Sequence, residues 1–245
     1  MTAQARLRRG LFELLYKNRA LYWLASTVPF AGQWRVWQRL AIPRLHGQDV
    51  LEVGCGIGNL LVEMTQAGYR CQAIDRSPQM VAATRDRLKR AGLAEKVEVR
   101  QGSVQRLPYE DASFDSVVST FPTDYIADPA TLREIARVLR PGGRLIIVLG
   151  ANLLPIGPVN FVLMLLHALV YGAAAGPVRH AARQPEQPAQ DGSAQDEAAP
   201  AGQPDERGFA AAGARVPLEE AGLRRSEERV TSHAWEAFLV IGEKT

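Results

Sequence analysis

The residues with the clearest chemical potential form a glycine-rich loop at residues 54–58. The loop follows a short apolar run at residues 49–53, and apolar side chains recur at helical spacing after it. A strand that leads through glycines into a helix brings backbone N–H groups close to a ligand, because glycine has no side chain to hold the ligand away. The pattern predicts a binding loop for a polar or anionic group, although many strand–helix connections carry glycine for turn geometry alone.

Two kinds of nucleotide ligand compete for this loop. A dinucleotide-binding fingerprint has glycines at its first, third and sixth positions. Here the first two are Gly54 and Gly56, but the sixth position is Asn59 and the third glycine stands at Gly58. Glu52, just before the loop, also disfavours a pyrophosphate. A carboxylate suits S-adenosylmethionine (SAM) instead, because SAM carries an ammonium and a sulfonium.

A second carboxylate, Asp75, ends the apolar run that follows the loop and its helix. A carboxylate in that position can accept two hydrogen bonds from a ribose diol. NAD enzymes use the same device, so Asp75 indicates an adenosine ligand without choosing between the two cofactors. It could instead cap the helix that is expected to begin near Pro78.

These binding residues need a sheet that gathers the ends of several strands. Between residues 49 and 150, short apolar runs alternate with helical patterns, which is typical of a parallel sheet with helices on both faces. Strands are expected at residues 49–53, 71–74, 97–99, 116–119 and 145–149, and helices at residues 59–68, 78–90 and 128–139. Near the end of the chain we expect a short helix and an antiparallel strand pair, at residues 216–221, 224–230 and 234–241.

Four blocks, taken in order, resemble the class I SAM-dependent methyltransferases, and most closely the subgroup of quinone-biosynthesis, small-molecule and lipid methyltransferases. The blocks are residues 52–58, 73–75, 107–115 and 132–143. The resemblance covers about residues 49–150 and implies an α/β fold with a Rossmann-like, doubly wound, seven-stranded sheet. The last strand of that sheet is antiparallel and lies beside the fifth, which fits the predicted C-terminal strand pair.

Parts of the later blocks have a structural interpretation. Phe114 is expected to pack in the core, and Asp115 to hold the turn into the fourth strand. Residues 141–143, Pro-Gly-Gly, are interpreted as a turn that stops one helix and starts the fifth strand.

The resemblance implies a SAM site built on the first two strands. Glu52 and the backbone of residues 54–58 would hold the methionine part of SAM. Asp75 would hold the ribose hydroxyls, and Arg76 and Met80 would flank the adenine.

The adenine end departs from the family pattern. The family usually has an acidic residue followed by a small one after the third strand, and here Ser103 and Val104 stand there. The carboxylate is lost, although the Val104 N–H could still reach the ring. Ser119 and Thr120, at the end of the fourth strand, would lie near the methyl group. The predicted cofactor-binding residues are Glu52, Gly54, Cys55, Gly56, Gly58, Asp75, Arg76, Met80, Ser103, Val104 and Thr120.

No catalytic residue and no metal site is predicted. Methyl transfer from SAM is an in-line displacement, and alignment and desolvation can supply much of its catalysis. A general base is needed only if the acceptor loses a proton. The nearest candidates are Asp124, Tyr125 and His167, and none has a signal that selects it. The cysteines, Cys55 and Cys71, have no partner at metal-ligand spacing.

The composition of the segments on either side of the SAM-binding core, residues 49–150, predicts how the rest of the chain is organised. Residues 1–48 have helical spacing and form an N-terminal cap. Residues 151–180, which are almost free of charge, form an apolar helical lid insert after the fifth strand. Residues 181–208 lack large aliphatic side chains and form a disordered linker. Residues 209–245 return to complete the sheet.

Charge and hydropathy bear on the partners. Residues 1–48 carry eight basic side chains, one acidic one and three of the four tryptophans. Such an arm suits an anionic membrane surface or nucleic acid, or it is a solvated helix face. The uncharged insert favours an apolar small-molecule or lipid acceptor, or a membrane contact. The absence of an Asn/Asp-Pro-Pro-aromatic motif after the fourth strand argues against nucleic acid.

The sequence therefore predicts a cytoplasmic SAM-dependent methyltransferase that acts on an apolar acceptor, either free in solution or attached peripherally to a membrane. Two alternatives stay open. One is a SAM-fold binding module without catalysis, and the other is an RNA methyltransferase that uses the basic N-terminal arm.

Overall fold

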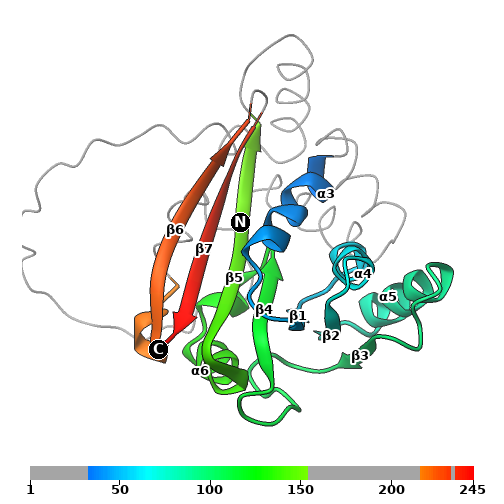
Figure 1. Ribbon diagram of the computed structural model, residues 1–245, viewed down its shortest axis with the longest axis horizontal. Helices are drawn as coiled ribbons and strands as arrows, with labels where there is room; N and C mark the ends of the chain where they lie inside the picture. Colours follow the sequence, from blue (N-terminus) through cyan, green and yellow to red (C-terminus); the bar gives the residue numbers. More distant parts are fainter. Residues whose placement is uncertain (1–32, 154–215, 233–234) are drawn as a thin grey trace, which may run out of the picture.

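A mixed sheet organises the part of the chain that the structure, a computed structural model, describes: residues 33–153, 216–232 and 235–245. Its seven strands lie in the order β3-β2-β1-β4-β5-β7-β6 (Figure 1). They are β1 (Asp49–Val53), β2 (Arg70–Asp75), β3 (Glu98–Gln101), β4 (Phe114–Thr120), β5 (Leu139–Leu153), β6 (Leu223–Thr231) and β7 (Trp235–Lys244). The first five strands pair in parallel, and β7 runs antiparallel to both β5 and β6. The predicted fold class is confirmed.

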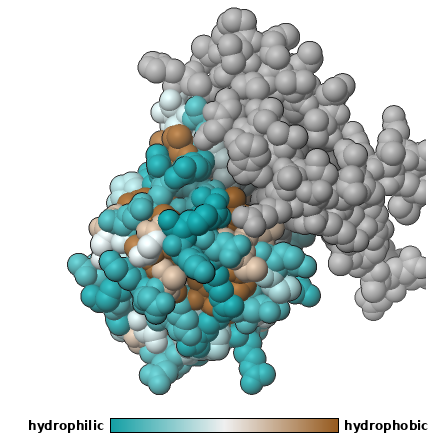
Figure 2. Space-filling model, turned by 90° about the vertical axis from the view of Figure 1, so that its right-hand side faces the viewer, coloured by the Kyte–Doolittle hydropathy of each residue, from teal (hydrophilic) through white to brown (hydrophobic). Residues whose placement is uncertain are grey.

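Helices cover both faces of the sheet. They are α3 (Gln33–Gln38), α4 (Asn59–Gln66), α5 (Pro78–Arg90) and α6 (Pro129–Val138), with short 3₁₀ segments η1 (Arg39–Arg44), η2 (Asp124–Ala127) and η4 (Glu219–Ala221). Buried side chains of α3, η1, α4 and α5 share one apolar cluster, and those of α6 belong to the other. Successive residues of β5, such as Leu145 and Ile146, alternate between the two clusters. The outer surface on the side of α4 and α5 is mostly hydrophilic (Figure 2).

The helix starts follow from capping residues in the sequence. The Ser77 hydroxyl accepts a hydrogen bond from Met80 N at 3.4 Å, and proline opens α5. Asp128 Oδ1 accepts from Ala130 N at 2.8 Å, and proline again opens the helix, α6. These contacts satisfy backbone donors that a helix leaves free at its start. Since Ser77 occupies the cap position of α5, Asp75 is not the cap of that helix.

The fifth strand is longer than predicted. It begins at Leu139, directly after α6, and the pairing with β4 jumps from Phe114–Leu139 to Ser116–Arg144. The residues expected to form a turn before the strand, 141–143, therefore lie inside it as a bulge. At its other end β5 continues through Leu153, so residues 151–153, which we assigned to the insert, extend the sheet.

Several predicted segments lie outside the described residues. They are most of the N-terminal cap (residues 1–32), most of the lid insert and the whole linker (within residues 154–215). Within the described ranges, no helix is both long enough and apolar enough to cross a bilayer.

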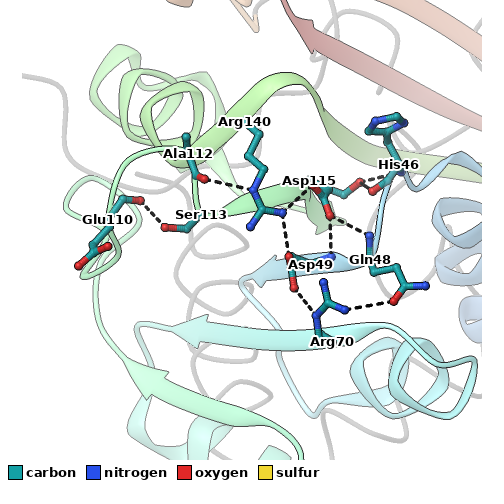
Figure 3. A network of polar contacts seen from close by, with 10 residues as sticks. His46, Gln48, Asp49, Arg70, Glu110, Ala112, Ser113, Asp115 and Arg140 are labelled. Carbon is teal, nitrogen blue, oxygen red and sulfur yellow. Dashed lines mark hydrogen bonds and ion pairs between the residues drawn. The ribbon is translucent and has the colours of Figure 1, made fainter.

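An ionic network joins the amino ends of β1, β2, β4 and β5 (Figure 3). Arg140 Nη1 lies 2.7 Å from both Asp49 Oδ2 and Asp115 Oδ1. Arg70 Nε donates to Asp49 Oδ1 at 2.6 Å, and Asp115 Oδ2 accepts from Asp49 N at 2.9 Å. Asp115 therefore ties β4 to β1, and Phe114 beside it is buried in the core, as predicted. The hydrogen bond from Arg70, followed by that from Arg140, lowers the pKa of Asp49 to about 2.

We expect the Arg140→Met variant to lose about 1–2 kcal/mol of unfolding free energy near pH 7, because two carboxylates lose a charged hydrogen-bond donor. The pKa of Asp49 is lowered in the folded state, so its contribution is present above the unfolded value near 4 and disappears as the pH falls towards 2. The difference between native and variant chains should shrink over that window. Denaturant titrations at several pH values would measure it, with the exposed Arg133→Met on α6 as the control. A difference independent of pH would contradict this account.

Candidate functional site

A pocket of about 950 Å³ lies where β1, β2, β3 and β4 end. Ligands of open α/β sheets bind at the carboxyl ends of the strands, where the loops converge. The segments that follow the four strands all contribute to the lining, and α3 adds further residues. The lining includes residues 54–57, Asp75 with residues 76–77, residues 103–105, and Thr120 with residues 121–123.

Most of the predicted cofactor residues meet in this pocket. Those that line it are Gly54, Cys55, Gly56, Asp75, Arg76, Met80, Ser103, Val104 and Thr120. Glu52 and Gly58 do not line it. Glu52 is buried directly before the loop, and Gly58 lies against Thr84 of α5.

Close contacts explain two of the glycines. A Cβ at Gly54 would lie 2.6 Å from the Tyr125 hydroxyl, and one at Gly58 would lie 2.8 Å from Thr84 Cγ2. Both glycines have positive φ, +70° and +73°. A side chain at either position would strain the backbone and displace a neighbour. Gly58 is the residue before α4, and its contact with Thr84 lets α4 and α5 approach closely.

Asp75 connects the glycine loop with the start of α5. Its Oδ2 accepts a hydrogen bond from Gly56 N at 2.9 Å, and its Oδ1 accepts one from Ser77 N at 2.9 Å. The side chain is 9% exposed and borders the pocket. A carboxylate has about four acceptor positions, so Asp75 can take further donors from a ligand while it keeps these two.

Glu52 is an ionisable side chain of the site that has an oxygen without a hydrogen-bond partner among the described residues. It is 1% exposed, and Oε2 is buried without a hydrogen-bond partner among the described residues. Burial, together with the nearby charge of Asp75, raises the pKa of Glu52 to about 8. Buried polar atoms nearly always have partners, so an unpaired one marks a position that a ligand can complete. A cationic group of a ligand beside this oxygen would favour the charged carboxylate.

The far side of the pocket is aromatic. Trp34 of α3 stacks on Phe121, with 4.0 Å between the ring centroids and 28° between the planes. Phe121 directly follows β4 and has a positive φ of 50°. Next to this pair, Gln38 Nε2 donates to Thr120 Oγ1 at 3.1 Å. Trp34, Gln38 and Phe121 were not predicted as site residues, although Trp34 and Gln38 share a helix face by their spacing of four.

Two of the candidate bases can be placed. The Tyr125 hydroxyl lies 2.7 Å from Ser119 Oγ and donates to the Val53 carbonyl at 3.3 Å. Burial raises the pKa of Tyr125, so its phenolate is not available at neutral pH. Asp124 is exposed and does not line the pocket. His167 lies outside the described residues.

The cysteines of the described residues are buried and reduced. Cys55 Sγ lies 3.7 Å from Thr84 Oγ1, and burial raises the pKa of its thiol. Burial also raises the pKa of Cys71, to about 11. Neither thiol is activated as a nucleophile. Across the described ranges, no three His, Cys, Asp or Glu side chains gather as a metal site would require.

Sequence comparison agrees with this geometry. Residues 51–147, from β1 to β5, match the family model described as a methyltransferase domain. The chain contains a class I SAM-dependent methyltransferase domain. SAM is the cofactor of this class, and the predicted family resemblance is confirmed.

Two relatives of this methyltransferase domain carry the name demethylmenaquinone methyltransferase. A demethylmenaquinone methyltransferase of Mycobacterium tuberculosis is 41% identical over 130 residues, which are 51% of this chain and 52% of that protein. A demethylmenaquinone methyltransferase of Symbiobacterium thermophilum is 33% identical over 145 residues, 56% of this chain and 57% of that protein. The chain thus spans about half the length of these relatives.

Solved structures share the fold. A SAM-dependent methyltransferase from Aquifex aeolicus superposes with a TM-score of 0.52 at 20% identity, over 85% of this chain and 89% of the other. A protein from Pyrococcus horikoshii superposes with a TM-score of 0.55 at 18% identity, over 86% and 90%. At this identity the likeness concerns the architecture of the methyltransferase domain alone.

Proposed function

We propose that this chain binds SAM in the pocket described above and transfers its methyl group to an apolar acceptor. The observation that carries the proposal is the arrangement of Asp75. This carboxylate borders the same pocket as the glycine loop, is held by Gly56 N, and keeps acceptor positions free. The combination offers acceptors for a ribose diol beside backbone donors for a carboxylate.

The site suggests how SAM would lie. The amino-acid part would rest on residues 54–57 above Glu52, whose buried oxygen could then pair with a cationic group. The ribose would meet Asp75, and the adenine would lie between Met80 and Val104. The sulfonium would then face Thr120 at the end of β4.

Alignment and exclusion of water would supply most of the catalysis. SAM brings an activated methyl group, so the protein must hold an acceptor in line with the methyl–sulfur bond. Trp34 and Phe121 could hold a flat apolar ring on that side. Apolar walls also remove water from the reacting atoms. Tyr125 would keep its proton, and it supports the loop through the Val53 carbonyl rather than acting as a base.

We further propose a quinone-like acceptor. The stacked Trp34–Phe121 pair supports a planar aromatic ligand, because aromatic faces gain from offset stacking. The named relatives act, by their names, on demethylmenaquinone. A lipid acceptor at a membrane surface and an RNA acceptor are the competing possibilities, and the segments that would support them lie largely outside the described residues.

A methyl-transfer assay tests the function. The purified chain would be incubated with methyl-labelled SAM and, separately, with a reduced demethylated menaquinone, phospholipid vesicles or RNA. Label in the quinol fraction supports the proposal, and label in another fraction replaces the acceptor. If SAM binds and no fraction is labelled, a binding module without catalysis is the better description.

We expect the Trp34→Ala variant to raise KM for the acceptor about tenfold, because one stacking face is lost. SAM affinity should change by less than about twofold, since Trp34 lies on the acceptor side. Steady-state kinetics and calorimetry would separate the two effects. The Trp34→Phe variant keeps an aromatic face and serves as the matched control. An equal loss of SAM and acceptor affinity in Trp34→Ala would contradict the assigned position.

A further inference from the structure

A glutamine at the adenine end of the pocket has its amide held in one orientation. Gln105 lines the pocket next to Ser103 and Val104. Its Nε2 donates to Asp128 Oδ2 at 3.2 Å, and its Oε1 accepts from the Ser103 hydroxyl. An ionised carboxylate can only accept hydrogen bonds, so the amide nitrogen must face Asp128. The carbonyl oxygen is therefore the end of the amide that is left for other donors.

The group that fixes the amide is itself fixed. Asp128 Oδ1 accepts from Ala130 N at 2.8 Å and caps α6. The helix is anchored by Leu132 and Ile135, which are fully buried. Asp128 thus uses one oxygen to cap a rigid helix and the other to orient Gln105. A side chain positioned in this way loses little conformational freedom when it binds a ligand.

We propose that Gln105 reads the adenine ring of the cofactor, with Asp128 as the positioning residue that sets the sense of the amide. The inference rests on the proposed function, since it needs SAM in the pocket. The exocyclic amino group of adenine is a donor, and the Gln105 carbonyl would accept it in place of the Ser103 hydroxyl. A base with a carbonyl at that position, such as hypoxanthine, would meet a second acceptor and bind less well.

Gln105 supplies an acceptor where the adenine end of the site departs from the family pattern. Ser103 has no carboxylate, yet the segment after β3 still presents an acceptor to the pocket two residues later. The acceptor is neutral, so its selectivity depends on which way the amide is turned. An isolated glutamine could rotate by half a turn and serve either base, and Asp128 removes that freedom.

Binding measurements with two ligands test the proposal. Calorimetry would compare S-adenosylhomocysteine with S-inosylhomocysteine, which differ at the base. The native chain should prefer the adenosyl ligand about tenfold, and Gln105→Ala should reduce that preference to about twofold, because one neutral hydrogen bond is lost. Gln101→Ala, an exposed glutamine at the end of β3 that does not line the pocket, is the matched control and should keep the native ratio.

The Asp128→Asn variant gives the sharper result. Asparagine caps helices as well as aspartate does, so α6 should remain intact. Its oxygen can still accept from Ala130 N, and its amide nitrogen then faces Gln105 and attracts the Gln105 carbonyl. The Gln105 amide turns over, and the preference for the adenosyl ligand should vanish or reverse. Thermal unfolding checks that the variant is folded.

The outcomes are distinct. If the native chain binds S-adenosylhomocysteine and all variants keep its preference, Gln105 is a surface residue and the inference is overturned while the proposed function stands. If the native chain binds neither SAM nor S-adenosylhomocysteine, the proposed function and the inference both fail. A loss of preference in Gln105→Ala together with its loss or reversal in Asp128→Asn supports the inference.

Discussion

The Asp75→Ala variant is expected to bind SAM at least about a hundredfold more weakly than the native chain, because two hydrogen bonds between a carboxylate and the ribose are lost at about 1.5–3 kcal/mol each. The glycine loop is also less well held in the variant, because Gly56 N and Ser77 N lose their hydrogen-bond acceptor. Isothermal titration calorimetry on the folded variant measures the change.

Two further variants make the Asp75 result specific. Asp75→Asn keeps one acceptor oxygen and should fall between the native chain and Asp75→Ala. Asp111→Ala removes an exposed aspartate that pairs with Arg137, away from the pocket, and should leave affinity unchanged. Native affinity in Asp75→Ala, with the fold intact, would remove this residue from the binding site.

The Glu52→Gln variant should be more stable than the native chain at alkaline pH in the absence of ligand. The pKa of Glu52 is raised to about 8 in the folded protein by burial and by the charge of Asp75, against 4.5 for an unperturbed glutamate. Between those values the folded state binds more protons than the unfolded state. The native chain therefore loses stability as the pH rises from about 5 to 8, on the order of 1 kcal/mol per pH unit. Glutamine cannot ionise and escapes this loss.

Denaturant titrations from pH 5 to pH 9 would show the two stability curves diverging as the pH rises. The Glu63→Gln variant is the control, because Arg39 and Arg35 lower the pKa of Glu63 and its removal brings no gain at high pH. Parallel curves for the native chain and Glu52→Gln would mean that Glu52 ionises normally. The same variant should bind SAM less well, since glutamine cannot supply a carboxylate to pair with a cationic group of the ligand.

Local sequence signals predicted most of the core. Ser77 and Asp128, each one residue before a proline, marked the starts of α5 and α6, because capping depends only on neighbouring residues. Alternating apolar runs placed β1 within its observed bounds. The bulge in β5 was missed because Pro-Gly-Gly at residues 141–143 has the chemistry of a turn. Only the pairing with β4 decides that it lies inside a strand.

Among the binding residues, too, those with a local sequence signal were predicted and those brought together by distant segments were not. The loop at residues 54–58 follows β1, and Asp75 ends the adjacent parallel strand β2, so a motif in the sequence could find both. The aromatic wall joins Trp34 and Phe121, which lie far apart in the chain. Its geometry depends on the positive φ of Phe121 and on the contact between α3 and the end of β4. The spacing of residues in the sequence predicts neither of these. Likewise, the link from Gln105 to Asp128 becomes visible only once η2 and α6 are placed.

The position of β7 between β5 and β6 sets a minimum length for the segment that connects β5 to β6. β5 leaves the sheet at Leu153, opposite Trp235, where β7 begins. Strand β6 begins at Leu223, opposite Lys244, where β7 ends. The chain between Leu153 and Leu223 must therefore span the length of β7, which is about 34 Å for its ten residues. In natural or engineered versions of this protein, that connection needs at least roughly ten residues. A shorter one could not span the distance, and β6 could not pair with β7.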